Sequence, residues 1–270
     1  MFSYIKAILD GIANPEKFDF NSKCGEISTA LDKFASDFKN LSSPKTVINY
    51  QTIVEHFAYI YRYGARDAAL MSIVVRKIRN KLKVKGTLNI LSVGGGAGID
   101  LLGLYDCKMG IKHTCLDKND WRDEYDVVKE IIDGKRAKDE LTAVEYTYVK
   151  KDINDINIKE LVDFNLFIFL YSASEFDSKD GLAFLEKIKN TKTKKIVVLV
   201  DNDAANLIGW FVNNMPGKKD LLTKNTAGCN LAIGEKTNLG NYYVELTKLN
   251  QSPILGGQNS KDSAIYAWEL

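Results

Sequence analysis

Hydrophobic residues recur in two different patterns along the chain, and the change comes near Thr87. Over residues 22–85 the apolar side chains lie three and four positions apart, which predicts helices and no strand. Gly64 divides the longest of these stretches into two predicted helices, over residues 46–63 and 65–82. We therefore expect an N-terminal helical region over residues 1–85.

From Thr87 onward, short apolar strands alternate with helical stretches. Strands are predicted for TLNILSV, IKHTCLD, AVEYTYVK, FNLFIFLY and KKIVVLVD, and helices for residues 99–108, 121–133, 158–162, 179–189 and 204–214. Strands joined by helical crossovers form a mainly parallel sheet that is covered on both faces. The second part of the chain, residues 86–270, is therefore predicted to be an α/β domain.

The C-terminal part departs from this alternation. NYYVELTKL and SAIYAWEL both read as strands and are separated only by a loop, which predicts an antiparallel hairpin at the edge of the sheet. The preceding residues 216–240 are rich in Lys, Asn, Thr and Gly and are predicted to be a long inserted loop, a type of segment that often serves as a lid.

Charge and composition exclude several classes of function. The 270 residues carry a formal net charge of +2, so the chain has no overall electrostatic footprint for nucleic acid. Five basic residues crowd the end of the second long predicted helix, where they suit the helix dipole; phosphate binding is the alternative for this cluster, Arg76, Lys77, Arg79, Lys81 and Lys83.

The few cysteines and histidines argue against a zinc site and against disulfides. The four cysteines form no CxxC pair, and the chain has only two histidines. The first residues show neither a basic leader nor a long apolar run, which argues against secretion and membrane insertion. We expect reduced thiols and a cytoplasmic or nuclear protein.

The segment LSVGGGAGID joins the first predicted strand to the next helix through four glycines, Gly94, Gly95, Gly96 and Gly98. Glycines at a strand-to-helix turn allow the backbone to approach a nucleotide closely. The dinucleotide pattern GxGxxG fails in both registers, and the P-loop pattern fails because Leu104 and Tyr105 stand where Lys and Ser or Thr are required. The spacing that fits is GxGxG.

Asp117 ends the second predicted strand, 21 positions after Gly96. A carboxylate about 20 residues beyond such a glycine turn commonly binds ribose hydroxyls. An isolated Asp is otherwise a helix cap or a turn residue. The combination with the glycine turn favours ribose binding.

These motifs, in this order, resemble the class I S-adenosylmethionine-dependent methyltransferases. The resemblance covers roughly residues 87–270 and implies an α/β, Rossmann-like seven-stranded sheet, with five parallel strands and a C-terminal antiparallel hairpin, plus an N-terminal helical extension. It implies S-adenosyl-L-methionine as cofactor and S-adenosyl-L-homocysteine as product. It also implies that Asp152 and Ile153 contact the adenine, beside which Trp121 is a further candidate.

The chain departs from this family at one position. The family commonly carries an acidic residue two positions before the first glycine, where this chain has Ser92. Candidates for holding the methionine end of the cofactor are therefore Asp100 and the upstream segment AYIYRYGARD, above all Arg62 and Tyr63, because an Arg fork suits a carboxylate. The alternative for that segment is a helix that packs its tyrosines into the core.

The end of the fourth strand, FIFLYSASEF, faces the methyl group in this family. Base-methylating members carry (D/N/S)PP(Y/F/W) or Pro-Cys there, and neither is present. Glu175 is the candidate that accepts a proton from the acceptor, and Tyr171 and Ser172 are candidates that orient it. Asp201 and its neighbours after the fifth strand are predicted to cap the following helix, and no metal site is expected from them.

The predicted function is methyl transfer from S-adenosylmethionine to an unidentified acceptor, with RNA, protein and small molecules all open. The alternatives are a non-catalytic binding or scaffold protein that keeps the fold and an NAD-dependent oxidoreductase, which the failed GxGxxG pattern disfavours. No membrane partner is expected.

Overall fold

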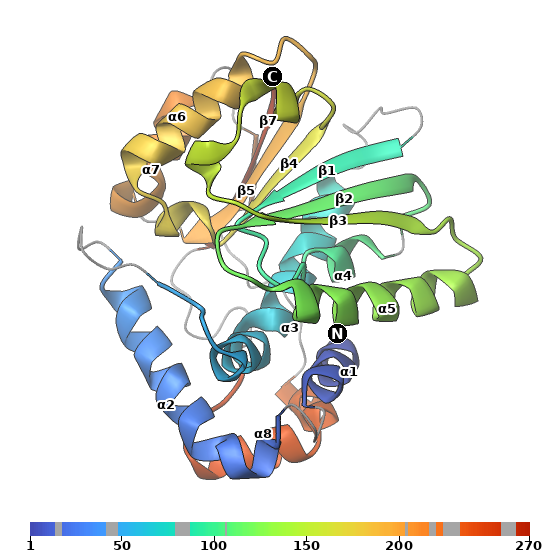
Figure 1. Cartoon of the computed structure of the whole chain (residues 1–270), viewed down its shortest axis with the longest axis vertical. Coiled ribbons are helices and arrows are strands. Elements are labelled where there is room, and N and C mark those ends of the chain that lie inside the picture. Colours follow the sequence, from blue (N-terminus) through green and yellow to red (C-terminus); the bar gives the residue numbers. More distant parts are fainter. Residues whose placement is uncertain are drawn as a thin grey trace.

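A mainly parallel sheet forms the middle layer of the molecule, as the alternating strands and helices predict (Figure 1). The computed structural model describes residues 1–13, 18–41, 48–78, 87–105, 107–202, 205–215, 220–223, 233–254 and 263–270. Within these residues the strand order is β3-β2-β1-β4-β5-β7-β6, and only β7 runs antiparallel to its neighbours. The strands are β1 (Thr87–Val93), β2 (Gly110–Asp117), β3 (Val144–Lys150), β4 (Leu166–Leu170), β5 (Ile196–Asn202), β6 (Asp220–Thr223) and β7 (Ser263–Glu269).

Helices cover both faces of the sheet, which makes three layers. On one face lie α3 (Ile53–Ile78), α4 (Leu101–Leu104) and α5 (Arg122–Lys138), and on the other lie α6 (Ser178–Lys189) and α7 (Ala205–Asn214) (Figure 1). Successive residues of a strand point to opposite faces. Ile90 accordingly joins the apolar core under α3 to α5, and its neighbour Leu91 joins the core under α6 and α7.

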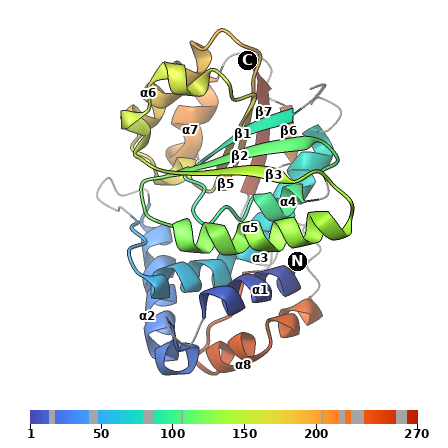
Figure 2. The same cartoon turned by 45° about the vertical axis from the view of Figure 1, so that its right-hand side comes forward.

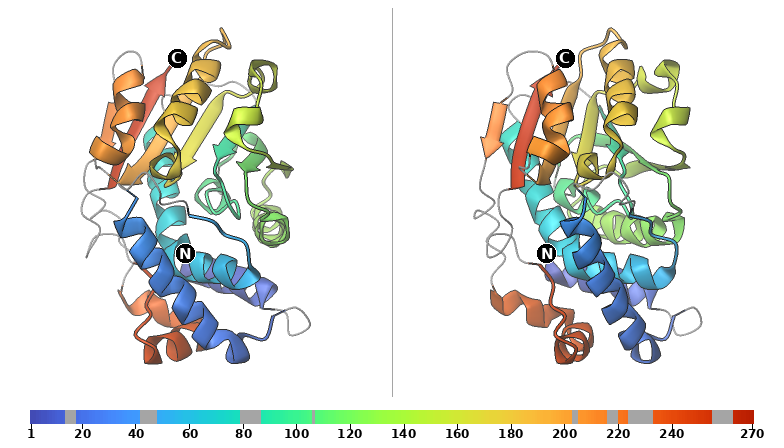
Figure 3. Two further views of the ribbon diagram at one scale, coloured as in Figure 1. Left: turned by 60° about the vertical axis from the view of Figure 1, so that its left-hand side comes forward. Right: turned by 90° about the vertical axis from the view of Figure 1, so that its left-hand side faces the viewer.

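Further helices lie outside the first of these layers. Helix α1 (Phe2–Ile12) packs on α3 and α5, and α2 (Phe20–Lys39) packs on α3 (Figure 2). Figure 3 shows α2 and α8 (Asn241–Lys248) side by side at the base of the molecule. Among the described helices, none combines the length and the apolar character that a membrane span requires.

Gly64 does not end a helix. The two helices predicted on either side of it form the single helix α3. A side chain at Gly64 would lie 3.0 Å from Ile5 Cδ1 of α1, so the glycine allows α1 to approach α3 closely. Helix α3 ends at Ile78 with Arg76 and Lys77 in its last turn, and the other three residues of the predicted basic cluster lie outside the described residues.

The predicted C-terminal hairpin is wrong in its first strand. NYYVELTKL forms helix α8, and the antiparallel partner of β7 is β6, which lies within the predicted inserted loop. Tyr242 of α8 packs against Phe20 and Phe57 of the N-terminal helices, and Leu246, four residues later, is buried in the same core. This spacing is helical, but a short run of mixed apolar residues fits a strand as well, so the tertiary contact decides.

The remaining elements are short. Within the predicted helix 99–108 only α4 forms a helix, and the predicted helix 158–162 is a 3₁₀ turn, η2 (Ile158–Leu161). Three further 3₁₀ turns are η1 (Ile153–Asp155), η3 (Ala173–Glu175) and η5 (Ile233–Leu239). Two of these turns, η1 and η3, follow the ends of β3 and β4 and bring polar side chains to the same edge of the sheet.

Candidate functional site

A cavity of about 240 Å³ opens at the carboxyl ends of β1, β2 and β4. The strand order reverses between β1 and β4, and ligands of open α/β sheets bind in the crevice at such a point. Residues predicted from the sequence supply much of its wall: Gly94, Gly95, Gly96, Asp100, Asp117, Trp121, Asp152, Ile153, Tyr171, Ser172 and Glu175.

The glycine turn has a backbone conformation that glycine adopts far more readily than other residues. Gly94, Gly96 and Gly98 all have positive φ, between 54° and 73°, which disfavours any other residue there. At Gly94 a side chain would also lie 2.6 Å from Ser172 Cβ, so the glycine lets the end of β4 approach β1. The Ser172 hydroxyl uses this proximity and donates to the Val93 carbonyl at 2.6 Å.

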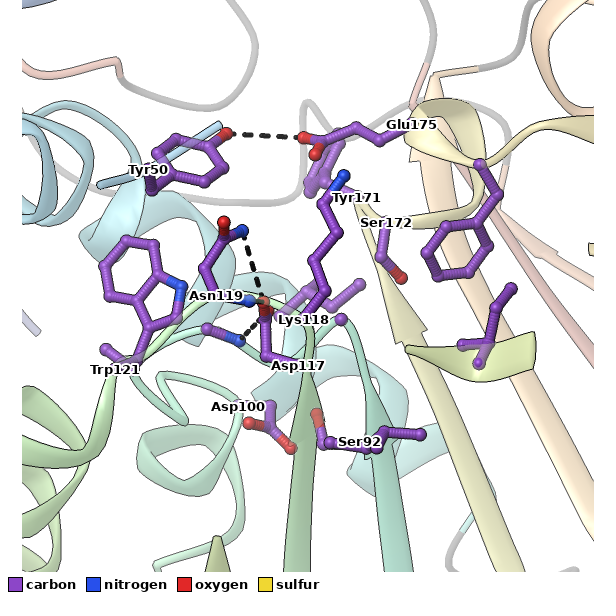
Figure 4. Close-up of a pocket in the computed structure, with 18 of the residues that line it drawn as sticks. Tyr50, Ser92, Asp100, Asp117, Lys118, Asn119, Trp121, Tyr171, Ser172 and Glu175 are labelled. Carbon is purple, nitrogen blue, oxygen red and sulfur yellow. Dashed lines mark hydrogen bonds between the residues drawn. The ribbon is translucent and has the colours of Figure 1, made fainter. Parts of the chain in front are cut away.

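Asp117 is bound to the glycine turn. Its Oδ2 accepts a hydrogen bond from the Gly96 backbone N–H at 3.0 Å, and its Oδ1 accepts from the Asn119 N–H at 2.8 Å (Figure 4). The carboxylate is 8% exposed, and burial raises its pKa although both N–H groups oppose the rise. The register places Val93 beside Leu116, so the ends of β1 and β2 bring the turn and the carboxylate together.

Asp100 lies on the floor of the cavity beside Ser92 (Figure 4). Its side chain is buried, and Oδ2 lies 2.9 Å from Nε2 of His113, whose Nδ1 is 2.8 Å from the Tyr125 hydroxyl. The other oxygen, Oδ1, has no hydrogen-bond partner among the described residues. A buried carboxylate oxygen without a partner is costly, which makes this atom a candidate ligand contact.

Trp121 forms one wall of the cavity and is held from behind. The His56 ring stacks on its indole at 3.9 Å between centroids, and His56 Nδ1 lies 2.8 Å from Glu124 Oε1. Tyr50 and Tyr59 contact the same indole at centroid distances of 5.3 and 5.8 Å. The indole Nε1 has no partner within the described part of the chain.

Asp152 and Ile153 reach the cavity from the end of β3. The Asp152 carboxylate caps η1 by accepting a hydrogen bond from the Asn154 N–H at 2.9 Å, and Ile153 is buried. The helix-cap role that the residue type favours is therefore observed for Asp152, while both residues line the cavity.

Glu175 stands on the opposite side, at the end of η3. Figure 4 shows its carboxylate facing Tyr50 across the cavity, with the Tyr50 hydroxyl donating to Oε1 at 3.4 Å. Burial and the negative charges of Asp117 and Asp201 raise the pKa of Glu175 to about 8. Asp201 also positions η3, because its Oδ2 accepts a hydrogen bond from the Ser174 N–H at 2.9 Å. The helix cap predicted for Asp201 and its neighbours would act at the start of α7, where residues 203 and 204 lie outside the described part of the chain.

Tyr171 precedes this turn in a conformation that side chains rarely adopt, with φ of 53°. The Arg66 guanidinium lies over its ring at 3.8 Å, and Arg66 in turn pairs with Asp67. Backbone strain of this kind is frequent at functional sites.

The proposed contacts of Arg62 and Tyr63 with the cofactor are not supported, because neither residue lines the cavity. The Arg62 guanidinium donates to the Gln251 side chain, and Tyr63 is buried against Phe38. The alternative of a helix that packs its tyrosines into the core is correct for this part of α3. Gly98 also lies off the cavity, where a side chain would meet the Tyr125 ring at 2.6 Å.

Three residues of the N-terminal region line the cavity. Tyr59 and Asp67 belong to the candidate segment AYIYRYGARD but were not singled out within it, and Tyr50 was not predicted at all. The Tyr59 hydroxyl donates to Asp67 Oδ2 at 3.2 Å, across two turns of α3. Tyr59 and Asp67 are eight residues apart on one side of α3, and this spacing was a signal in the sequence that could have paired them. Tyr50 precedes the helix and meets Glu175 over 125 residues, so no local pattern could reveal it.

No three His, Cys, Asp or Glu side chains gather into a potential metal site among the residues that the structure describes. Charged groups at the cavity are instead paired with neighbours or face the open space. Lys118 is the cation that extends into this space, running from the end of β2 toward Tyr171 and Glu175 (Figure 4).

Comparison with known proteins finds similarity only to solved structures. No family model and no curated protein matches the chain. It is similar to the plantazolicin methyltransferase BpumL in complex with SAH, with 10% identity, a TM-score of 0.45 and coverage of 93% of this chain and 98% of that chain. It is also similar to magnesium protoporphyrin IX methyltransferase (ChlM) from Synechocystis PCC 6803 with bound SAM, with 8% identity, a TM-score of 0.41 and coverage of 86% and 88%. A third similar structure is an S-adenosylmethionine-dependent methyltransferase from Clostridium acetobutylicum ATCC 824, with 15% identity, a TM-score of 0.37 and coverage of 66% and 59%.

Proposed function

We propose that this chain is an S-adenosylmethionine-dependent methyltransferase whose cofactor binds in the cavity at the ends of β1 and β2. The observation that supports this most is the hydrogen bond from the Gly96 N–H to the Asp117 carboxylate. It joins a glycine turn of positive φ to an acidic residue at the neighbouring strand end, the pair of features that a nucleoside with free ribose hydroxyls requires.

The methionine end of the cofactor carries an ammonium group, and Asp100 fits it. Asp100 lines the cavity, and its buried Oδ1 has no partner among the described residues. His113 holds the other oxygen and so fixes the orientation of the carboxylate. Asp100 thereby supplies the negative charge that the position of Ser92 lacks.

The base of the cofactor fits the side of the cavity that Trp121 and Ile153 form. Trp121 offers an aromatic face, and its Nε1–H has no partner in the described part of the chain. His56 and Glu124 hold the indole from behind, so the wall is rigid before any ligand arrives. Asp152 lies next to Ile153 and offers a hydrogen-bond acceptor to an exocyclic amine.

When bound, S-adenosylmethionine supplies a methyl group on a positively charged sulfur; the acceptor's lone pair bonds to the carbon as the carbon–sulfur bond breaks, and the bonding electrons stay on sulfur. Glu175 accepts the proton that the acceptor loses. Its pKa of about 8 lies near neutral pH, where a general base works best. Tyr50 holds the carboxylate across the cavity, and Asp201 holds the turn that carries it.

The N-terminal region, residues 1–85, completes the acceptor side in this proposal. Tyr50, Tyr59 and Asp67 come from it, and they line the cavity. A region that both covers the site and contributes side chains to it would act in acceptor recognition.

Isothermal titration tests the proposal with S-adenosylmethionine, S-adenosylhomocysteine, 5′-methylthioadenosine and NADH. We expect saturable binding of the first three and none of NADH. Methylthioadenosine has the ribose and the adenine but no amino-acid end, so Asp100→Asn should weaken S-adenosylhomocysteine by about tenfold or more and leave methylthioadenosine unchanged. Absence of binding by the adenosyl ligands would refute the cofactor assignment; equal losses for both ligands in the variant would refute the role of Asp100.

A further inference from the structure

The acceptor end of the cavity has an aromatic wall. Tyr50 and Tyr59 meet at 5.2 Å between centroids in an edge-to-face arrangement, and both contact Trp121. Tyr50 is 6% exposed, so its ring is already desolvated. Aromatic faces in a desolvated site attract cations through their quadrupoles.

Carboxylates surround this wall. The Tyr50 hydroxyl donates to Glu175, and the Tyr59 hydroxyl donates to Asp67. Burial raises the pKa of both tyrosines well above its usual value, so they stay neutral donors. Both tyrosines thus line the cavity while their hydroxyls orient carboxylates.

The cavity as a whole is acidic. Arg66 neutralises Asp67, and His113 faces Asp100. Five further carboxylates line the cavity without an ion pair to any described residue, namely Asp117, Asp152, Glu175, Asp177 and Asp180. Against them stand two lysines, of which Lys151 pairs with Glu160 outside, so Lys118 alone extends toward Glu175. The field therefore favours a cation and opposes a phosphate or a carboxylate.

We infer that the methyl acceptor is an amine, which enters as an ammonium ion between the Tyr50–Tyr59–Trp121 wall and Glu175. This inference rests on the proposed function. The ammonium gives one proton to the Glu175 carboxylate, and the freed lone pair bonds to the methyl carbon as the carbon–sulfur bond breaks with its electrons on sulfur. The product leaves as a methylated ammonium, and Glu175 returns its proton to water. Charge and atoms balance, with one proton released per transfer.

Calorimetry with matched probes tests the acceptor class. In each set of probes, molecules with a closely similar carbon skeleton carry an amine, an alcohol or a carboxylate; one set is 2-phenylethylamine, 2-phenylethanol and phenylacetate. Adenosine monophosphate and a short RNA are titrated as well. Each is titrated with and without saturating S-adenosylhomocysteine. We expect at least one amine to bind about tenfold more tightly than its carboxylate partner. Preference for the carboxylate, the phosphate or the RNA, or no preference in any set, would overturn the inference.

Two variants of opposite charge separate recognition from damage to the fold. Above about pH 8, where Glu175 is ionised, Glu175→Gln should weaken amine binding by about tenfold, whereas Lys118→Gln should tighten it a few-fold, because the competing cation is gone. Glu186→Gln, an exposed change on α6, is the control and should change neither. Tighter amine binding in Glu175→Gln, or weaker amine binding in Lys118→Gln, would refute an amine acceptor. If S-adenosylhomocysteine itself fails to bind, the proposed function fails; if it binds and no amine does, the acceptor inference alone fails.

Discussion

Replacement of Asp117 by asparagine probes the contact on which the proposed cofactor site depends. The carboxylate offers one oxygen to the Gly96 N–H and the other to the Asn119 N–H. Asparagine keeps the size and one carbonyl oxygen but puts an NH₂ group against the second N–H. One buried backbone donor therefore loses its acceptor.

The magnitude follows from these bonds. A hydrogen bond to a charged group contributes about 1.5–3 kcal/mol to stability. Burial destabilises the charged form of Asp117, as its raised pKa indicates, so the loss of this charge offsets part of the lost hydrogen-bond energy. We expect a net loss of about 1–2 kcal/mol in the free energy of unfolding and a fall of about 2–8 °C in the melting temperature. The ribose hydroxyls lose one charged acceptor as well, so affinity should fall about 10- to 150-fold.

Calorimetry and thermal unfolding are measured on the same samples. Because the ribose is common to both ligands, Asp117→Asn should lower the affinities for S-adenosylhomocysteine and methylthioadenosine equally. Asp100→Asn, by contrast, should lower only the affinity for S-adenosylhomocysteine. Asp126→Asn, at an exposed position on α5, serves as the control and should change neither quantity by much. An unchanged affinity in a folded Asp117→Asn protein would refute ribose binding at this site.

Three further outcomes are expected. The methyl-transfer rate should rise with pH up to about 8, where Glu175 becomes ionised, and Glu175→Gln should lower it by about 10²–10⁴ and flatten this rise in a pH–rate profile. Because the folded state holds the Glu175 proton up to about pH 8 while an unfolded glutamate releases it near its ordinary pKa, wild-type stability should fall over that window relative to Glu175→Gln in denaturant titrations. Gly103→Ala should lower the free energy of unfolding by about 1–3 kcal/mol, because its Cβ would lie 2.7 Å from the Ser72 backbone nitrogen. Gly134→Ala, in open space on α5, should raise it by about 0.5–1 kcal/mol, and denaturant titration measures both.

The sequence predicted those parts of the fold and site that depend on local backbone conformation. Strands and helices alternate with distinct periodicities, and the GxGxG spacing marked the strand-to-helix turn, whose three glycines have positive φ in the structure. Asp117 followed because parallel strand ends meet at one edge of a sheet. In the C-terminal part the same reasoning failed, since NYYVELTKL fits a helix or a strand until its neighbours are known.

Only the tertiary structure decided which side chains face one another across the cavity. Tyr50 meets Glu175 over 125 residues, and Arg62 turns to Gln251 over 189 residues rather than to the cavity. Gly64 is required by the approach of α1 to α3 and not by a helix end. Local sequence determines backbone preference because that preference depends on each residue and its immediate neighbours. Contacts across layers depend on how the helices dock, so only the tertiary structure determined the proposed acceptor side of the site.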